Sequence, residues 1–95
     1  MEFEWDERKR RTNLAKHGID FETAKLIFEG TFIEREDRRR GYGERRIVAY
    51  GEASGVVLCV VYTRREDRLR IISVRRARRD ERKDYYAATS TRGAT

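Results

Sequence analysis

Cysteine and histidine are nearly absent from this chain of 95 residues. Cys59 is the only cysteine, which excludes an internal disulfide and a metal site built from several thiolates. It lies in the most apolar stretch of the sequence, residues 56–62, where a buried and unreactive thiol is expected. His17 is the only histidine, and Asp and Glu form no spaced cluster, so the sequence is a poor site for zinc or manganese. We therefore expect neither a metal nor another cofactor.

Long hydrophobic runs are also missing. No apolar stretch approaches the roughly 20 residues that a transmembrane helix needs. The acidic beginning of the chain, residues 1–5, lacks the hydrophobic region of a signal peptide. The sequence has no proline and no internal repeat. These absences predict a cytoplasmic protein without a membrane partner, and the single cysteine agrees with a reducing compartment.

Charge, by contrast, is abundant and unevenly distributed. Charged residues make up 42% of the chain, and the net charge is +6. Residues 1–37 carry seven Lys/Arg and ten Asp/Glu, a net charge of −3, whereas residues 38–95 carry sixteen and seven, a net charge of +9. A basic half of this kind favours a polyanionic partner such as nucleic acid. The alternative is the ordinary solvated surface of a small, highly charged protein.

The hydrophobic pattern predicts one α+β domain over residues 1–88 and a flexible polar tail over residues 89–95. Asp6 and Asp20 are typical helix N-caps, and Gly18 is typical of a helix end. After residue 30 the pattern predicts an antiparallel meander of four strands, with the third of them, apolar on both faces, at the centre of the sheet. The predicted elements are a short strand at 2–5, two N-terminal helices at 6–16 and 20–29, strands at 31–34, 46–50, 56–63 and 69–76, and one C-terminal helix at 80–88.

The last predicted strand, residues 69–76, combines an apolar centre with arginines. Regular alternation would place Arg70 and Val74 on one face of this strand and Ser73 and Arg75 on the other. Arginine suits phosphate binding because its planar guanidinium can donate two parallel hydrogen bonds and stays charged. Two predicted neighbouring strands, residues 56–63 and 69–76, are flanked by cations that should partly converge in space: Arg64, Arg65, Arg70, Arg75 and Arg76. The alternative is a set of solvated strand-end cations paired with carboxylates such as Glu66, Asp67 or Glu81.

Cleavage of RNA without a metal is a reaction that these residues are chemically able to perform. The 2′-hydroxyl of RNA is the nucleophile, so the protein must transfer protons and stabilise charge on the phosphate. Histidine titrates near neutral pH and is a natural proton carrier, while positioned arginines stabilise the charge. For His17 the structural alternative is a cap that bonds the last carbonyls of the first helix. Trp5 could stack on a base, although a core position is expected, and Tyr85 could serve the site or the packing.

Short motifs follow one another in a fixed order through most of the chain, over about residues 3–86. They are Phe3-Glu4-Trp5-Asp6 with Lys9, Asn13, Lys16-His17-Gly18, Phe21-Glu22 with Ala24 and Phe28, Arg70-Ile71-Ile72-Ser73, Arg75-Arg76-Ala77, Glu81-Arg82 and Tyr85. Taken together, this ordered set resembles the BrnT family of bacterial toxins.

The resemblance implies a RelE-like fold and an endoribonuclease toxin of a type II toxin–antitoxin system that inhibits translation. It implies a BrnA-like antitoxin with a ribbon-helix-helix domain, and contact with operator DNA only through the toxin–antitoxin complex. By this similarity, catalysis is expected from His17, Arg65, Arg70 and Arg75. Further RNA contacts are expected from Lys9, Lys16, Arg64, Arg76 and Tyr85.

One position departs from the family pattern. The family usually opens the last helix with Thr or Ser, which forms a capping box with a Glu. This chain has Arg78 three residues before Glu81. The sequence therefore predicts that this cap is lost.

Two other classes of function stay open on the sequence. A non-catalytic nucleic-acid-binding module would use the same arginines, would need no role for His17, and would bind with a steep salt dependence. A protein-interaction module would present its basic face to an acidic or amphipathic partner, which is also how an antitoxin could neutralise a toxin.

Overall fold

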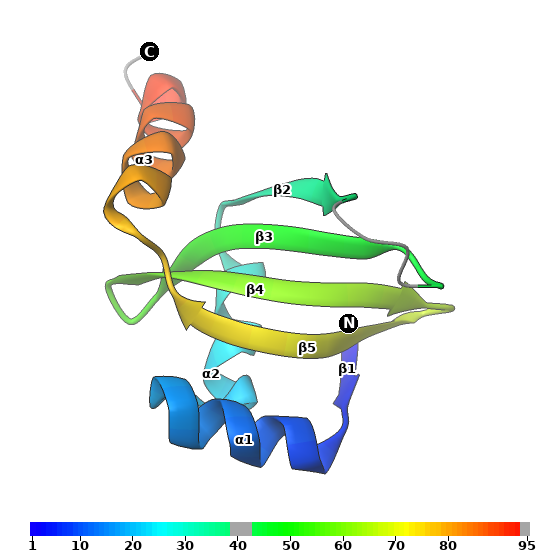
Figure 1. The fold of residues 1–95 in the computed structure, drawn as a ribbon. Coiled ribbons are helices and arrows are strands. Elements are labelled where there is room, and N and C mark those ends of the chain that lie inside the picture. The colour runs from blue at the N-terminus through cyan, green and yellow to red at the C-terminus, as the bar shows by residue number, and fades with distance from the viewer. Residues whose placement is uncertain (39–42, 94–95) are drawn as a thin grey trace.

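The computed structural model describes residues 1–38 and 43–93 and shows an α+β fold built on one five-stranded sheet (Figure 1). The strand order is β1-β5-β4-β3-β2, so β4 is central, as predicted. The elements are β1 (Glu2–Trp5), α1 (Glu7–His17), α2 (Phe21–Ala24) continued by the 3₁₀ helix η1 (Lys25–Glu29), β2 (Phe32–Asp37), β3 (Arg46–Ala53), β4 (Val56–Arg65), β5 (Arg68–Arg76) and α3 (Arg79–Gly93).

The sheet is mixed. Strands β2 to β5 form the predicted antiparallel meander, whereas β1 pairs with β5 in the parallel direction. Parallel strands cannot be joined by a tight hairpin, and here the helices and the rest of the meander lie between them in the chain. A membrane-spanning helix is absent from the described part of the chain, because none of its helices combines the required length with an apolar sequence.

The first two helices begin and end where the sequence predicts. Asp6 accepts a hydrogen bond from the amide of Arg8 at 2.8 Å, and Asp20 accepts one from the amide of Glu22 at 3.1 Å. Gly18 ends α1 with a φ of 72°, a conformation that glycine adopts without steric cost. These caps depend on neighbours in the sequence, which explains why they could be predicted.

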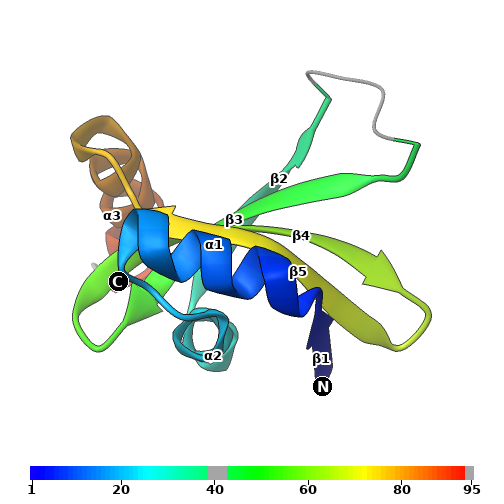
Figure 2. The same ribbon diagram turned by 60° about the horizontal axis from the view of Figure 1, so that its bottom comes forward.

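The main core lies between the sheet and the helices α2 and η1, while α1 runs alongside the edge of β5 (Figure 2). Phe21, Ile27 and Val60 have no exposed surface in this core. Trp5 packs at its border against Phe21, with ring centroids 5.8 Å apart. The prediction of a structural role for Trp5 is therefore confirmed.

The opposite face of the sheet carries a smaller apolar cluster. It consists of Val48, Tyr50, Val57, Cys59, Ala77 and Tyr85. The thiol of Cys59 is free and the residue is buried, as predicted. Helix α3 lies across the sheet from α1, so the two terminal regions of the chain cover different parts of the sheet (Figure 1).

A β-bulge interrupts β5. The register between β4 and β5 shifts between Val61 and Tyr62, whose partners are Ser73 and Ile71, so that Ile72 has no partner in β4. One extra residue reverses the alternation of all side chains beyond it. The regular alternation predicted for this strand was wrong for that reason.

The bulge brings Arg70 and Arg75 to the same face of the sheet. Paired residues of neighbouring strands share a face, and these arginines pair with Thr63 and Cys59, which are four residues apart in β4. Val74 points into the main core instead. A regular strand would have placed the two arginines on opposite faces.

The C-terminal helix also differs from its prediction. It runs to Gly93, beyond the predicted end at residue 88, so the predicted polar tail is helical as far as the structure describes it. The capping box is half present, because Glu81 Oε1 accepts a hydrogen bond from the amide of Arg78 at 2.7 Å. Only the hydroxyl half of the cap is missing.

Strands β2 to β5 are slightly longer than predicted, and the predicted turn at 37–43 lies partly outside the described residues.

Candidate functional site

A pocket on the α3 side of the sheet combines the histidine with several cations. Its volume is about 410 Å³, and it lies between the end of α1, the strands β2 to β5 and the start of α3. We name it the central pocket. Its lining residues are Lys16, His17, Arg35, Val48, Tyr50, Cys59, Val61, Ser73, Arg75, Arg78 and Glu81.

Asn13 holds the end of α1 at this pocket. The pairing of β5 with β1 ends at Ile71, which leaves the next part of β5 without a strand partner on that side. The buried side chain of Asn13 takes the partner's place, because its Oδ1 accepts from the amide of Val74 at 3.1 Å and its Nδ2 donates to the same residue's carbonyl at 2.8 Å. His17 lies one helical turn further along α1, so this contact positions His17 relative to β5.

Glu81 holds the guanidinium of Arg75. Nη1 and Nη2 of Arg75 donate to the two carboxylate oxygens of Glu81 at 2.8 and 2.9 Å, the bidentate geometry that arginine favours. The Tyr50 hydroxyl donates to the same carboxylate at 3.1 Å, in addition to the amide of Arg78. Only 12% of the Glu81 side chain is exposed. Arg75 is thus paired with Glu81, which was the alternative that the sequence left open.

This ion pair shifts the pKa values of both partners. The hydrogen bonds from Arg75 lower the pKa of Glu81 to about 2, against the opposing effect of burial. The hydrogen bond with Glu81 raises the pKa of Arg75. Burial raises the pKa of the Tyr50 phenol and of the Cys59 thiol. Near pH 7 the pocket therefore contains a charged pair and a neutral thiol, which is a weak nucleophile.

His17 is exposed and, within the described part of the chain, makes no hydrogen bond or ion pair. It does not cap α1, because the carbonyl of Leu14 accepts its hydrogen bond from the amide of Gly18 at 2.8 Å. An imidazole without an intramolecular partner can exchange a proton with a ligand in the pocket.

Arg65 and Arg70 lie on the same face of the sheet as the central pocket but outside it. Arg70 binds Glu4 at 3.0 Å, and Arg65 binds Glu44 at 3.2 Å. The β4 partners of Arg70 and Arg75 are four residues apart, which corresponds to about 13 Å of strand. Arg70 and Arg75 are therefore well separated along the same face of the sheet.

The residues predicted to bind RNA are divided between the two faces of the sheet. Lys16 lines the central pocket, and Lys9 lines a groove beside it. Arg64 lies on the other face, 5.7 Å from the ring centroid of Tyr62. Tyr85 is only 3% exposed and donates a hydrogen bond to a backbone carbonyl, so its ring contributes to the smaller apolar cluster.

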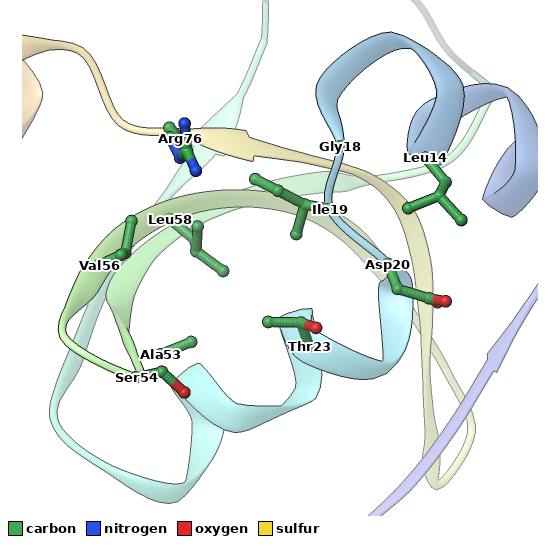
Figure 3. Close-up of a pocket in the computed structure, with 10 residues that line it drawn as sticks. All are labelled: Leu14, Gly18, Ile19, Asp20, Thr23, Ala53, Ser54, Val56, Leu58 and Arg76. Carbon is green, nitrogen blue, oxygen red and sulfur yellow. The ribbon is translucent and has the colours of Figure 1, made fainter.

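Arg76 lines a second pocket, of about 330 Å³, on the face opposite the central pocket (Figure 3). Leu58, Ala53 and Ile19 point into this space, which makes it mainly apolar. Its ionisable lining residues are Arg76 and Asp20, and Asp20 is bound to Arg10 at 2.8 Å. No lining residue suits proton transfer near neutral pH, so we place the candidate site in the central pocket.

Arg35 and Tyr50 were missed by the sequence reasoning. They belong to β2 and β3, and only the register of these strands turns them toward Arg75 and Glu81. The sequence offered one indication of a role for Tyr50, namely a polar side chain within an apolar strand.

Among the described residues, no group of three or more His, Cys, Asp or Glu side chains is placed to hold a metal ion.

Comparison with known protein families gives a match over most of the chain. Residues 5–81 match the family described as "Ribonuclease toxin, BrnT, of type II toxin-antitoxin system". This range includes every lining residue of the central pocket, from Lys16 to Glu81. The comparison with curated proteins gave no match.

Proposed function

This chain belongs to the BrnT family of type II toxin–antitoxin ribonuclease toxins, and from that membership we propose that it cleaves RNA in the central pocket without a metal ion. The observation that carries the proposal is the pocket itself. It joins His17, which is exposed and unbonded among the described residues, to Arg75, whose guanidinium is held in place by Glu81.

In this reaction the 2′-hydroxyl of one nucleotide attacks the phosphate that joins it to the next. The O2′–P bond forms and the P–O5′ bond breaks, which leaves a 2′,3′-cyclic phosphate and a free 5′-hydroxyl. One proton leaves the 2′-oxygen and one is delivered to the 5′-oxygen. His17 carries one of these protons, because its exposed imidazole lines the pocket and can act as a general acid or base.

Arg75 stabilises the negative charge that develops on the phosphate. Two of its five N–H donors bind Glu81 and a third binds the carbonyl of Arg76, so two donors are left for phosphate oxygens. A guanidinium that is already held in position does not have to reorganise during the reaction. Lys16 and Arg35 line the same pocket and add positive charge.

Arg70 and Arg65 contact phosphates further along the RNA in this proposal. They lie on the same face as Arg75, and each would exchange a carboxylate partner, Glu4 or Glu44, for a phosphate. The α+β architecture is compatible with the RelE-like fold that the resemblance implies. We further propose that the protein acts in the cytoplasm and that a BrnA-like ribbon-helix-helix antitoxin neutralises it and contacts the operator DNA.

The direct test is RNA cleavage by the purified protein in the presence of EDTA. We expect the wild type to cut and to leave 2′,3′-cyclic phosphate or 3′-phosphate ends. His17→Ala should cut at least about 100-fold more slowly, since a proton-transfer group typically contributes ~10²–10⁴-fold. The variant should unfold at the same temperature as the wild type, because the imidazole has no hydrogen bond to other described residues.

Absolute dependence on a divalent metal would reject this mechanism. Full activity of His17→Ala would mean that a group other than His17 carries the proton. RNA binding without any cleavage would instead support the nucleic-acid-binding module.

A further inference from the structure

A groove along α1 continues from the central pocket. It has a volume of about 310 Å³ and shares Lys16, His17 and Ser73 with that pocket. A ligand can therefore extend from one into the other without crossing the sheet. We name it the α1 groove, and its other lining residues are Arg8, Lys9, Thr12, Asn13 and Ile72.

The geometry of the helix aligns the polar side chains of this groove. Lys9, Thr12 and Lys16 are separated by three and four residues, so they lie on one side of α1. With a rise of 1.5 Å per residue, Lys9 and Lys16 are about 10 Å apart along the helix axis. The row leads away from His17, which is the candidate proton carrier.

The cations of the α1 groove have no carboxylate partner among the described residues, unlike Arg65, Arg70 and Arg75. In the part of the chain that the structure describes, no ion pair includes Arg8, Lys9 or Lys16. The pKa of the nearby Asp6 carboxyl is lowered mainly by a hydrogen bond from the amide of Arg8, and the charge of Lys9 contributes less. Cations that do bind carboxylates include Arg10, Arg64, Arg65, Arg70 and Arg75.

Unpaired cations beside a reaction site create a local positive potential that attracts a polyanion. A cation without a partner can also bind a phosphate without first giving up a carboxylate. This favours the α1 groove over the paired arginines as the first stretch of surface that an RNA strand occupies.

We propose that the α1 groove binds the ribose–phosphate backbone of the RNA next to the cleaved bond. The proposal rests on the proposed function and adds to it a second phosphate-binding subsite. Lys9 contacts a phosphate away from the reaction centre, and Lys16 contacts the backbone where groove and pocket meet. Ile72 is half-buried and, as the extra residue of the bulge, offers an apolar contact to a ribose or a base.

The test measures binding of a fluorescent 2′-O-methyl RNA hexanucleotide, which lacks the nucleophile and is not cut. Lys9→Gln is compared with Arg11→Gln at several salt concentrations. Arg11 is a matched control because it belongs to the same helix, is exposed, and lines neither the α1 groove nor the central pocket. Both substitutions remove one positive charge.

We expect Lys9→Gln to weaken binding and to reduce the slope of log K against log salt by about 0.7, the value for one phosphate contact on a single strand. Arg11→Gln should leave the slope close to that of the wild type. Equal effects of the two substitutions, or no binding by the wild type, would overturn the proposal.

Cleavage of unmodified RNA by the same proteins separates this proposal from the proposed function. If the wild type binds the hexanucleotide through Lys9 but cuts no RNA, the proposed binding in the α1 groove is supported and the proposed ribonuclease activity is rejected. If the wild type cuts RNA but its binding does not depend on Lys9, the proposed binding in the α1 groove is overturned and the proposed ribonuclease activity stands.

Discussion

Arg75 and Glu81 form a bidentate ion pair, with both terminal nitrogens of the guanidinium bound to both oxygens of the carboxylate at 2.8 and 2.9 Å. The two residues belong to different elements, since Arg75 is near the end of β5 and Glu81 is in the first turn of α3. The pair therefore connects the sheet to the C-terminal helix at the wall of the central pocket. Glu81 both orients a candidate phosphate-binding group and stabilises the start of a helix.

Glu81→Gln should slow RNA cleavage roughly tenfold to a hundredfold, because a misplacement of ~1 Å can cost ~10²-fold in rate. Glutamine keeps the size of the side chain and loses the charge that holds Arg75. The value of kcat should fall more than KM rises, since the RNA contacts outside the pocket stay intact. Steady-state cleavage kinetics check this, with Asp84→Asn on the same helix as the control. Equal rates for the two variants would show that Glu81 does not support the site.

Acidification should remove the contribution of Glu81 to the stability of the protein. The pKa of its carboxyl is about 2 in the folded protein, against an ordinary value of 4.5. Between these values the unfolded chain binds more protons, so the free energy of unfolding rises with pH. The contribution of Glu81 is therefore complete above about pH 4.5 and is lost as the pH falls toward 2.

Urea unfolding of the wild type and of Glu81→Gln between pH 2.5 and 7 measures this contribution. The difference in unfolding free energy between the two proteins should shrink on acidification. A difference that stays constant over this range would contradict the low pKa of Glu81.

Asn13→Ala should destabilise the fold by about 1–3 kcal/mol, because it leaves the buried amide and carbonyl of Val74 without partners. The cleavage rate should also fall, since α1 loses the contact that positions His17. Urea denaturation and cleavage assays at full folding check the two effects separately. Thr12→Ala, at the exposed neighbouring position, should change stability by less than about 0.5 kcal/mol. A similar loss in both variants would assign the effect to the helix as a whole.

Arg75→Lys and Arg76→Lys should have unequal effects although the residues are adjacent. Arg75 lines the central pocket, whereas Arg76 lines the mainly apolar pocket on the other face. Lysine keeps the charge and loses the fork that binds Glu81 and phosphate together, so Arg75→Lys should reduce kcat about 10²-fold. Arg76→Lys should cleave RNA at nearly the wild-type rate. Comparable losses in kcat would place the reacting phosphate within reach of both faces.

The elements of this fold were largely predictable because their signals are local. Asp6, Asp20 and Gly18 mark helix ends through hydrogen bonds to neighbours within a few residues. The two-sided apolar pattern of β4 placed it at the centre of the sheet. The ordered motifs also predicted the family that the match over residues 5–81 shows.

The candidate site was less predictable because its contacts join distant segments. His17 and Arg75 were singled out as functional residues, and the fold places both in one pocket. Their supports, Asn13 with Val74 and Glu81 with Arg75, depend on how α1 and α3 dock on β5. No local pattern specifies such docking, which explains why Arg35 and Tyr50 were missed.

The sequence by itself determined the class of the fold, the single cysteine and histidine, the excess of cations in the second half and the family. Only the tertiary structure decided which cations share a face. One unpaired residue, Ile72, reverses the alternation of β5 and places Arg70 and Arg75 together, while Arg76 turns to the opposite face. The register of a strand is set by its pairing with a neighbour and by the core that it covers, and neither is visible in the strand's own residues.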